Sequence, residues 1–101
     1  MWLNSKEEKI IGNFLQEMEN AKQSSEYEIQ WENSIIYGSL DTIYEDDNML
    51  EIEDPNYEEF WTVLLRINKI IKNGDEIQGY KVGDLIEINY HNAPKEFKLV
   101  Q

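Results

Sequence analysis

The longest apolar run of the sequence, Phe60 to Ile71, decides which fold the chain can adopt. As a helix, the run would begin after Pro55 and end at Asn73-Gly74. As a strand, it would place five apolar side chains on one face: Trp61, Val63, Leu65, Ile67 and Ile71. We favour a strand over residues 60–72, because apolar residues at Leu65 and Ile70 widen the helical stripe beyond one clean face. A strand of this length must bend.

Regular patterns flank this run on both sides. Ser5 and Glu8 have the spacing of a capping box, and the apolar residues that follow recur at helical intervals. Residues 27–32 alternate strictly, and Asn33-Ser34 is expected to form a two-residue turn that sets Trp31 opposite Ile36. The next strand would continue the apolar face through Leu40 and Tyr44. The predicted elements are a helix at 5–22 and strands at 27–32, 35–44, 60–72, 85–90 and 96–100.

These elements predict an α+β fold, with an N-terminal amphipathic helix packed on a curved antiparallel sheet of about five strands. A chain of 101 residues is long enough for a single core, so we expect one domain over residues 1–101. In architecture alone, the pattern is similar to small barrels of the OB or SH3-like type, and closure into such a barrel is the alternative. The absence of cysteine, of a basic leader and of a long apolar segment predicts a cytoplasmic protein without a membrane span.

The net charge of −12 comes from the middle of the chain. Between Lys22 and Arg66 there are 12 acidic residues and no basic one, whereas the rest of the chain holds nine of each sign. Phosphate binding depends on Lys and Arg, so this distribution argues against direct contact with nucleic acid. A contiguous negative surface can instead speed encounter with a basic protein by about 10- to 10³-fold. We therefore expect a basic protein partner.

Residues 45–59 are predicted to form an acidic loop, because eight acids and the Asp54-Pro55 breaker fall between residues 44 and 59. Loops of this length inside compact domains are usually functional or disordered. Met49, Leu50 and Ile52 are expected to anchor the loop to the body. Aromatic residues ringed by charge are typical of tight interfaces. The predicted partner-binding residues are Tyr44, Glu45, Asp46, Asp47, Glu51, Glu53, Asp54, Tyr57, Glu58 and Glu59.

Residues suited to catalysis or metal binding are scarce. His91 is the only histidine and there is no cysteine, which removes most nucleophile-plus-base arrangements and ordinary zinc sites. Among 21 acids, some carboxylate pair will lie close by chance. Asp46-Asp47-Asn48 resembles the start of a calcium loop, but Leu50 and Glu51 stand where an oxygen ligand and a glycine belong. The sequence predicts no enzyme activity, no metal and no cofactor.

The function predicted from these features is that of a non-enzymatic, acidic protein-binding module. In size and charge the chain resembles immunity proteins for nuclease toxins and inhibitors that mimic DNA. That resemblance implies neutralisation of a basic partner, such as a toxin nuclease or a nucleic-acid-binding protein. Two alternatives remain open: a small accessory or regulatory domain whose acidity serves only solubility, and an OB-like ligand binder. The sequence does not decide the oligomeric state.

Overall fold

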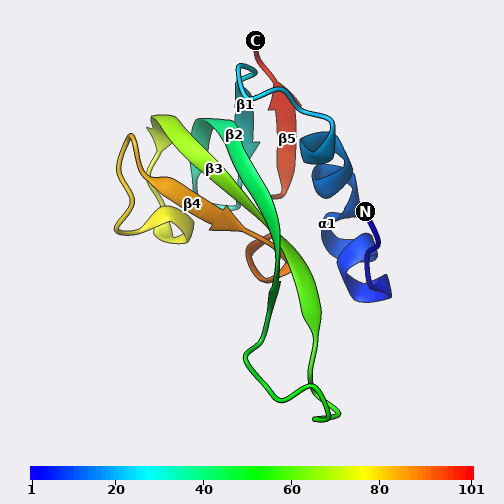
Figure 1. The fold of residues 1–101 in the computed structure, drawn as a ribbon. Coiled ribbons are helices and arrows are strands. Elements are labelled where there is room, and N and C mark those ends of the chain that lie inside the picture. Colours follow the sequence, from blue (N-terminus) through cyan, green and yellow to red (C-terminus); the bar gives the residue numbers. More distant parts are fainter.

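The structure, a computed structural model, describes all of residues 1–101 and contains one α-helix packed on a five-stranded antiparallel sheet (Figure 1). The strand order is β4-β3-β2-β1-β5, and the sheet stays open. The predicted α+β class is confirmed, whereas the barrel alternative is not formed. No helix is long and apolar enough to span a membrane. The elements, in which η denotes a short 3₁₀ helix, are α1 (Ser5–Glu19), β1 (Tyr27–Gln30), β2 (Ile35–Asp47), β3 (Glu59–Lys72), η1 (Asp75–Ile77), β4 (Leu85–Ile88), η2 (Tyr90–Asn92) and β5 (Glu96–Leu99).

The apolar run is a strand, as predicted, and β3 lies between β2 and the edge strand β4. It pairs with β2 from Glu59 to Lys72 and with β4 from Val63 to Arg66. Its side chains at Val63, Leu65 and Ile67 are almost fully buried, because this face packs into the core beneath α1. In Figure 1, β2 and β3 cross the body of the molecule and then project beyond it as a long hairpin.

Three extra residues in the β2–β3 ladder change which side chains reach the core. Asp41, Asn68 and Ile71 have no partner across the ladder, and each one shifts the alternation of the strand that carries it. As a result Ile70 packs against the core, whereas Ile71, predicted to face inward, is 46% exposed. Ile43 likewise takes the inward position that was predicted for Tyr44. A period-two pattern read without bulges cannot locate these shifts.

The turn between β1 and β2 also differs from the prediction. Gln30 pairs with Ile35, so the turn has four residues, Trp31 to Ser34, and Ile29 rather than Trp31 lies opposite Ile36. The cause lies far along the chain, because Glu76 accepts hydrogen bonds from the Asn33 amide at 3.0 Å and the Ser34 hydroxyl at 2.7 Å. The Ser34 hydrogen bond is the main cause of a lowered pKa of Glu76. The partner of Ile36 is thus two residues earlier in β1 than predicted. Because side chains alternate with a period of two, the same side chains still face the core.

The first turn of α1 closes the free edge of β3. Asn4, not Ser5, is the N-cap, and Glu7 completes the capping box; the helix ends at Glu19 instead of Lys22. Glu7 is only 1% exposed, and its Oε2 accepts the Trp61 amide hydrogen bond at 2.5 Å. Asn4 Nδ2 donates to the Glu59 carbonyl at 3.0 Å. Because β4 begins its pairing only at Val63, the helix start supplies the hydrogen-bond partners that a strand would otherwise give.

We predict that Gly38→Ala destabilises the fold by about 1–3 kcal/mol, because overpacking in a closed core forces neighbours to move. A Cβ at position 38 would lie 2.5 Å from Leu65 Cδ2 and 2.9 Å from the Arg66 carbonyl oxygen. Leu65 is therefore the neighbour that requires glycine. Urea denaturation measures the effect. As a control, Gly12→Ala in α1 should be stabilising by about 0.5–1 kcal/mol, since alanine is the better helix former.

Candidate partner-binding site

All ten predicted partner-binding residues lie on the projecting hairpin, which we define as residues 44–61 and call the hairpin arm. Four of them end β2, five lie in the connecting segment and Glu59 begins β3. The connecting segment is shorter than the predicted loop at 45–59, because β2 continues to Asp47. Figure 1 shows this arm extending away from α1 and from the rest of the sheet.

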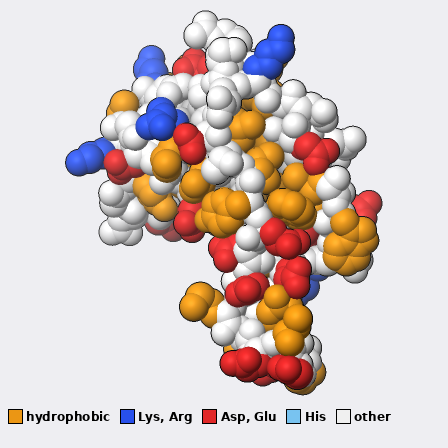
Figure 2. Space-filling model, in the orientation of Figure 1, with side chains coloured by type: hydrophobic (Ala, Val, Ile, Leu, Met, Phe, Trp, Pro, Cys, Tyr) orange, Lys and Arg blue, Asp and Glu red, His pale blue; other side chains and the backbone are white.

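The arm concentrates negative charge that nothing in the chain neutralises. It holds eight Asp and Glu residues and no Lys or Arg. The ion pairs of the protein all lie elsewhere, at Glu19, Glu28 and Asp41. No three of the acids come close enough together to share a metal ion. In Figure 2, acidic side chains follow the arm to its tip, while most visible Lys and Arg side chains lie on the body. Such a surface attracts a basic partner at long range.

Hydrogen bonds within the arm connect the two sides of its tip. Asn48 donates from Nδ2 to the Asn56 carbonyl at 2.7 Å, and its amide donates to the Glu58 carbonyl at 3.3 Å. Asp47 Oδ1 accepts from the amide of Met49 at 2.7 Å, which supports the left-handed backbone of Met49 at φ 67°. An ordered tip loses less conformational entropy on binding than a flexible loop would.

Three apolar side chains at the tip point into solvent. Met49 is 90% exposed, Ile52 70% and Leu50 41%. The prediction that they anchor the loop to the body was wrong, because the arm carries them beyond the reach of the body. Figure 2 shows hydrophobic side chains beside the acids at the tip. Exposed apolar side chains rimmed by charge are characteristic of an interface, so these three residues belong to the candidate site although sequence reasoning had excluded them.

The two predicted tyrosines of the site are held by carboxylates. The Tyr57 hydroxyl donates to Glu59 at 3.0 Å, and this hydrogen bond is the main cause of the raised pKa of Tyr57. The Tyr44 hydroxyl donates to Glu87 of β4 at 3.1 Å, and its pKa is raised by burial first and by Glu87 second. Both rings therefore stiffen the arm as well as offering aromatic surface.

Packing fixes the root of the arm to the body. Phe60 is 6% exposed and meets Tyr90 of η2 edge-on, with ring centroids 5.6 Å apart. The Tyr90 hydroxyl donates to Glu58. Among the predicted acids, Glu58 is therefore the one whose carboxylate is used in a contact with the body of the protein. Its main role is to position the arm, and it offers less charge to a partner than the other acids do.

We predict that Tyr90 titrates far above an ordinary tyrosine, because burial and the Glu58 hydrogen bond raise its pKa to about 12. Burial is the larger cause, so Glu58→Gln should lower this pKa only part of the way toward its ordinary value of 10.0. The raised pKa favours the folded state fully below pH 10, and this contribution is lost as the pH rises toward 12. Because the pKa of Tyr27 is also raised to about 12, the titration is followed by NMR of ¹³C-labelled tyrosine rings, which resolves Tyr90 in the wild type and in Glu58→Gln. A Tyr90 that ionised near pH 10 would contradict the buried contact.

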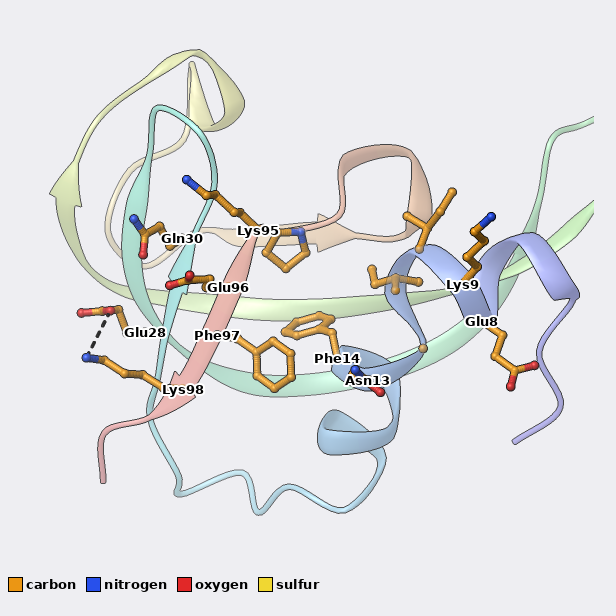
Figure 3. A pocket seen from close by; sticks show the side chains of 14 residues that line it. Glu8, Lys9, Asn13, Phe14, Glu28, Gln30, Lys95, Glu96, Phe97 and Lys98 are labelled. Atoms are coloured by element: carbon orange, nitrogen blue, oxygen red, sulfur yellow. Dashed lines mark ion pairs between the residues drawn. The ribbon is translucent and has the colours of Figure 1, made fainter.

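A hollow between α1 and β5 is a weaker candidate for the partner-binding site. It has a volume of about 490 Å³ and lies beside the edge-on pair Phe14 and Phe97. Figure 3 shows side chains of both signs around it, including the Glu28–Lys98 ion pair at 3.6 Å. Three acids and three lysines line this hollow, so their charges balance. The hollow therefore has no net charge that would attract a charged partner.

Comparison with known proteins assigns the chain to a family. The family model described as cognate immunity protein YxxD matches residues 7–101, a range that includes the entire sheet and the hairpin arm. No curated protein and no solved structure matches the chain significantly. The match extends over nearly the whole sequence and continues through the site described above. The chain therefore belongs to the cognate immunity protein YxxD family.

Proposed function

We propose that this protein neutralises its cognate toxin by binding it through the hairpin arm. We further propose that the toxin presents a basic surface to the arm and, most concretely, that the toxin is a nuclease. The observation that carries the proposal is the arm itself, with eight carboxylates that form no ion pair and three exposed apolar side chains on a hydrogen-bonded tip. Membership of an immunity protein family supports a toxin as the partner.

The chemistry of the arm suits competition with a nucleic-acid substrate. A nuclease binds phosphates through Lys and Arg, and carboxylates spaced along a narrow arm can occupy the same cationic positions. Charge brings the partners together, and burial of Met49, Leu50 and Ile52 then slows dissociation. The protein acts as a stoichiometric binder without catalysis, and its proposed place of action is the cytoplasm, where the nucleic acids of the cell need protection.

Neutralisation with purified components tests this function. The toxin gene is expected beside the gene of this protein, and the two products are mixed at increasing ratios while toxin activity is measured on RNA and DNA. We expect activity to vanish at a 1:1 ratio and the complex to elute as one species in size-exclusion chromatography. A complex that forms but leaves the toxin fully active would refute neutralisation by binding. A toxin that binds equally well after removal of residues 48–57 would refute the role of the arm.

A further inference from the structure

A groove of about 550 Å³ lies between the N-terminal segment and α1, outside the residues predicted to bind a partner. It combines an indole, two carboxylates and two amide side chains, and no Lys or Arg side chain lines it. Its lining residues include Met1, Trp2, Glu8, Asn13, Gln16 and Glu19. Glu19 is paired with the α-amino group of Met1 at 3.4 Å, so Glu8 is the carboxylate of the groove that remains for a cationic ligand.

Trp2 is held in place without being buried. Its carbonyl accepts the indole N–H of Trp61 at 2.9 Å, and two residues later Asn4 is bonded to the Glu59 carbonyl. The side chain of Trp2 is nevertheless 80% exposed. The fold therefore fixes the backbone and leaves the large aromatic surface free, which is the arrangement of an aromatic anchor and not of a core residue.

Glu8 supplies an unpaired carboxylate to the same groove. It takes part in none of the three ion pairs of the chain, whereas Glu19 lies 3.4 Å from the α-amino group of Met1. Glu8 lines both this groove and the hollow between α1 and β5, and Figure 3 shows its side chain pointing away from Lys9. The charge of Glu8 is therefore available to a ligand in the groove.

Gly12 leaves the floor of the groove open in the middle of α1, where glycine is unfavourable. A Cβ at this position would meet Glu8 Cγ at 3.5 Å, Leu3 Cδ1 at 3.8 Å and Glu8 Cβ at 3.9 Å, all ordinary contact distances. Packing within the protein thus does not require glycine. The missing side chain instead gives a ligand access to the helix surface.

We propose that this groove accepts an arginine side chain of the bound toxin, an inference that rests on the proposed function only for the source of the arginine. A guanidinium group stacks on the face of Trp and pairs with a carboxylate through its planar fork, so Trp2 and Glu8 would contact it together. The groove adjoins the root of the hairpin arm through the Trp61–Trp2 hydrogen bond. One basic partner can therefore contact both the arm and the groove.

The test uses the free protein and needs no toxin. Nα-acetyl-arginine amide is titrated into the ¹⁵N-labelled chain, and the Trp2 indole N–H and Gly12 amide resonances are followed by NMR. The neutral isostere Nα-acetyl-citrulline amide is the matched ligand. We expect saturable shifts at the groove with arginine, and binding that is weaker by about fivefold or more with citrulline, because the cation–π and carboxylate contacts need the charge.

Three variants locate the binding. Trp2→Leu and Glu8→Gln should weaken arginine binding by about fivefold each. As the control, Glu32→Gln removes one negative charge from an exposed residue outside the groove. This variant should change the affinity for arginine by less than about twofold. Equal shifts with arginine and citrulline would overturn the proposal, as would shifts that spread over all acidic positions without saturating at the groove. If the toxin did not bind the arm but arginine still bound the groove, the proposed function would be overturned and the groove site would be retained.

Discussion

Replacing Glu51 and Glu53 with lysine slows association with the toxin by about tenfold at low salt, because both reversals lie in the field that steers a basic partner. These two acids are exposed and make no side-chain hydrogen bond, so their loss removes charge without disturbing the loop. Asp46 and Asp47 are poorer choices, since both accept hydrogen bonds from backbone amides of the arm. Surface plasmon resonance at several salt concentrations measures the association rate.

The matched control reverses Glu32 and Glu96, which are also exposed but lie on the body. Each double variant has the same net charge, since two reversals change the wild-type value of −12 by four units to −8. If the field of the arm steers association, the control slows it by less than about twofold, and the difference between the variants shrinks as salt screens charges beyond about 8 Å. Equal slowing by both pairs would show that only the total charge matters, and the acidity would then be a general solubility feature.

Replacing Met49 with Asn and Ile52 with Ser accelerates dissociation and weakens binding by about 2 kcal/mol or more, if these side chains are anchors in the complex. A loss of that size corresponds to about a 30-fold higher Kd. Asn is chosen at position 49 because it tolerates the left-handed backbone found there. Both side chains are exposed in the free protein, so the free energy of unfolding should change by no more than about 0.5 kcal/mol. Dissociation is followed by competition with unlabelled protein.

The control for this variant truncates two apolar residues of the body, Val82 and Leu99, each 58% exposed, to serine. This pair should leave the dissociation rate unchanged within about twofold. Tyr57→Ala is a less specific test, because it also removes the hydrogen bond to Glu59 and loosens the arm. An unchanged dissociation rate in the Met49 and Ile52 variant would exclude the tip from the interface, even if the charge reversal had slowed association.

The clustering of acids on one segment was predictable from sequence because these residues are close together in the chain. Eight acids within residues 44–61 are neighbours in any fold, and a hairpin only decides how they are presented. The exposure of Met49, Leu50 and Ile52 could not be found in this way, because apolar residues in a loop fit the core and the surface equally well. Trp2 and Glu8 were missed for another reason, since residues six apart share a groove only after the N-terminal segment folds back along α1.

The sequence by itself determined the elements that depend on local periodicity and composition: the N-terminal helix, the long strand with its alternating Val63, Leu65 and Ile67, the α+β class and the acidic middle of the chain. Only the tertiary structure decided the features that depend on distant partners. Glu76 fixes the turn at Asn33 and Ser34, and Glu7 closes the edge of β3 at Trp61. The physical reason is that a buried hydrogen-bonding group must find a partner, and which partner it finds depends on where the chain brings the elements together.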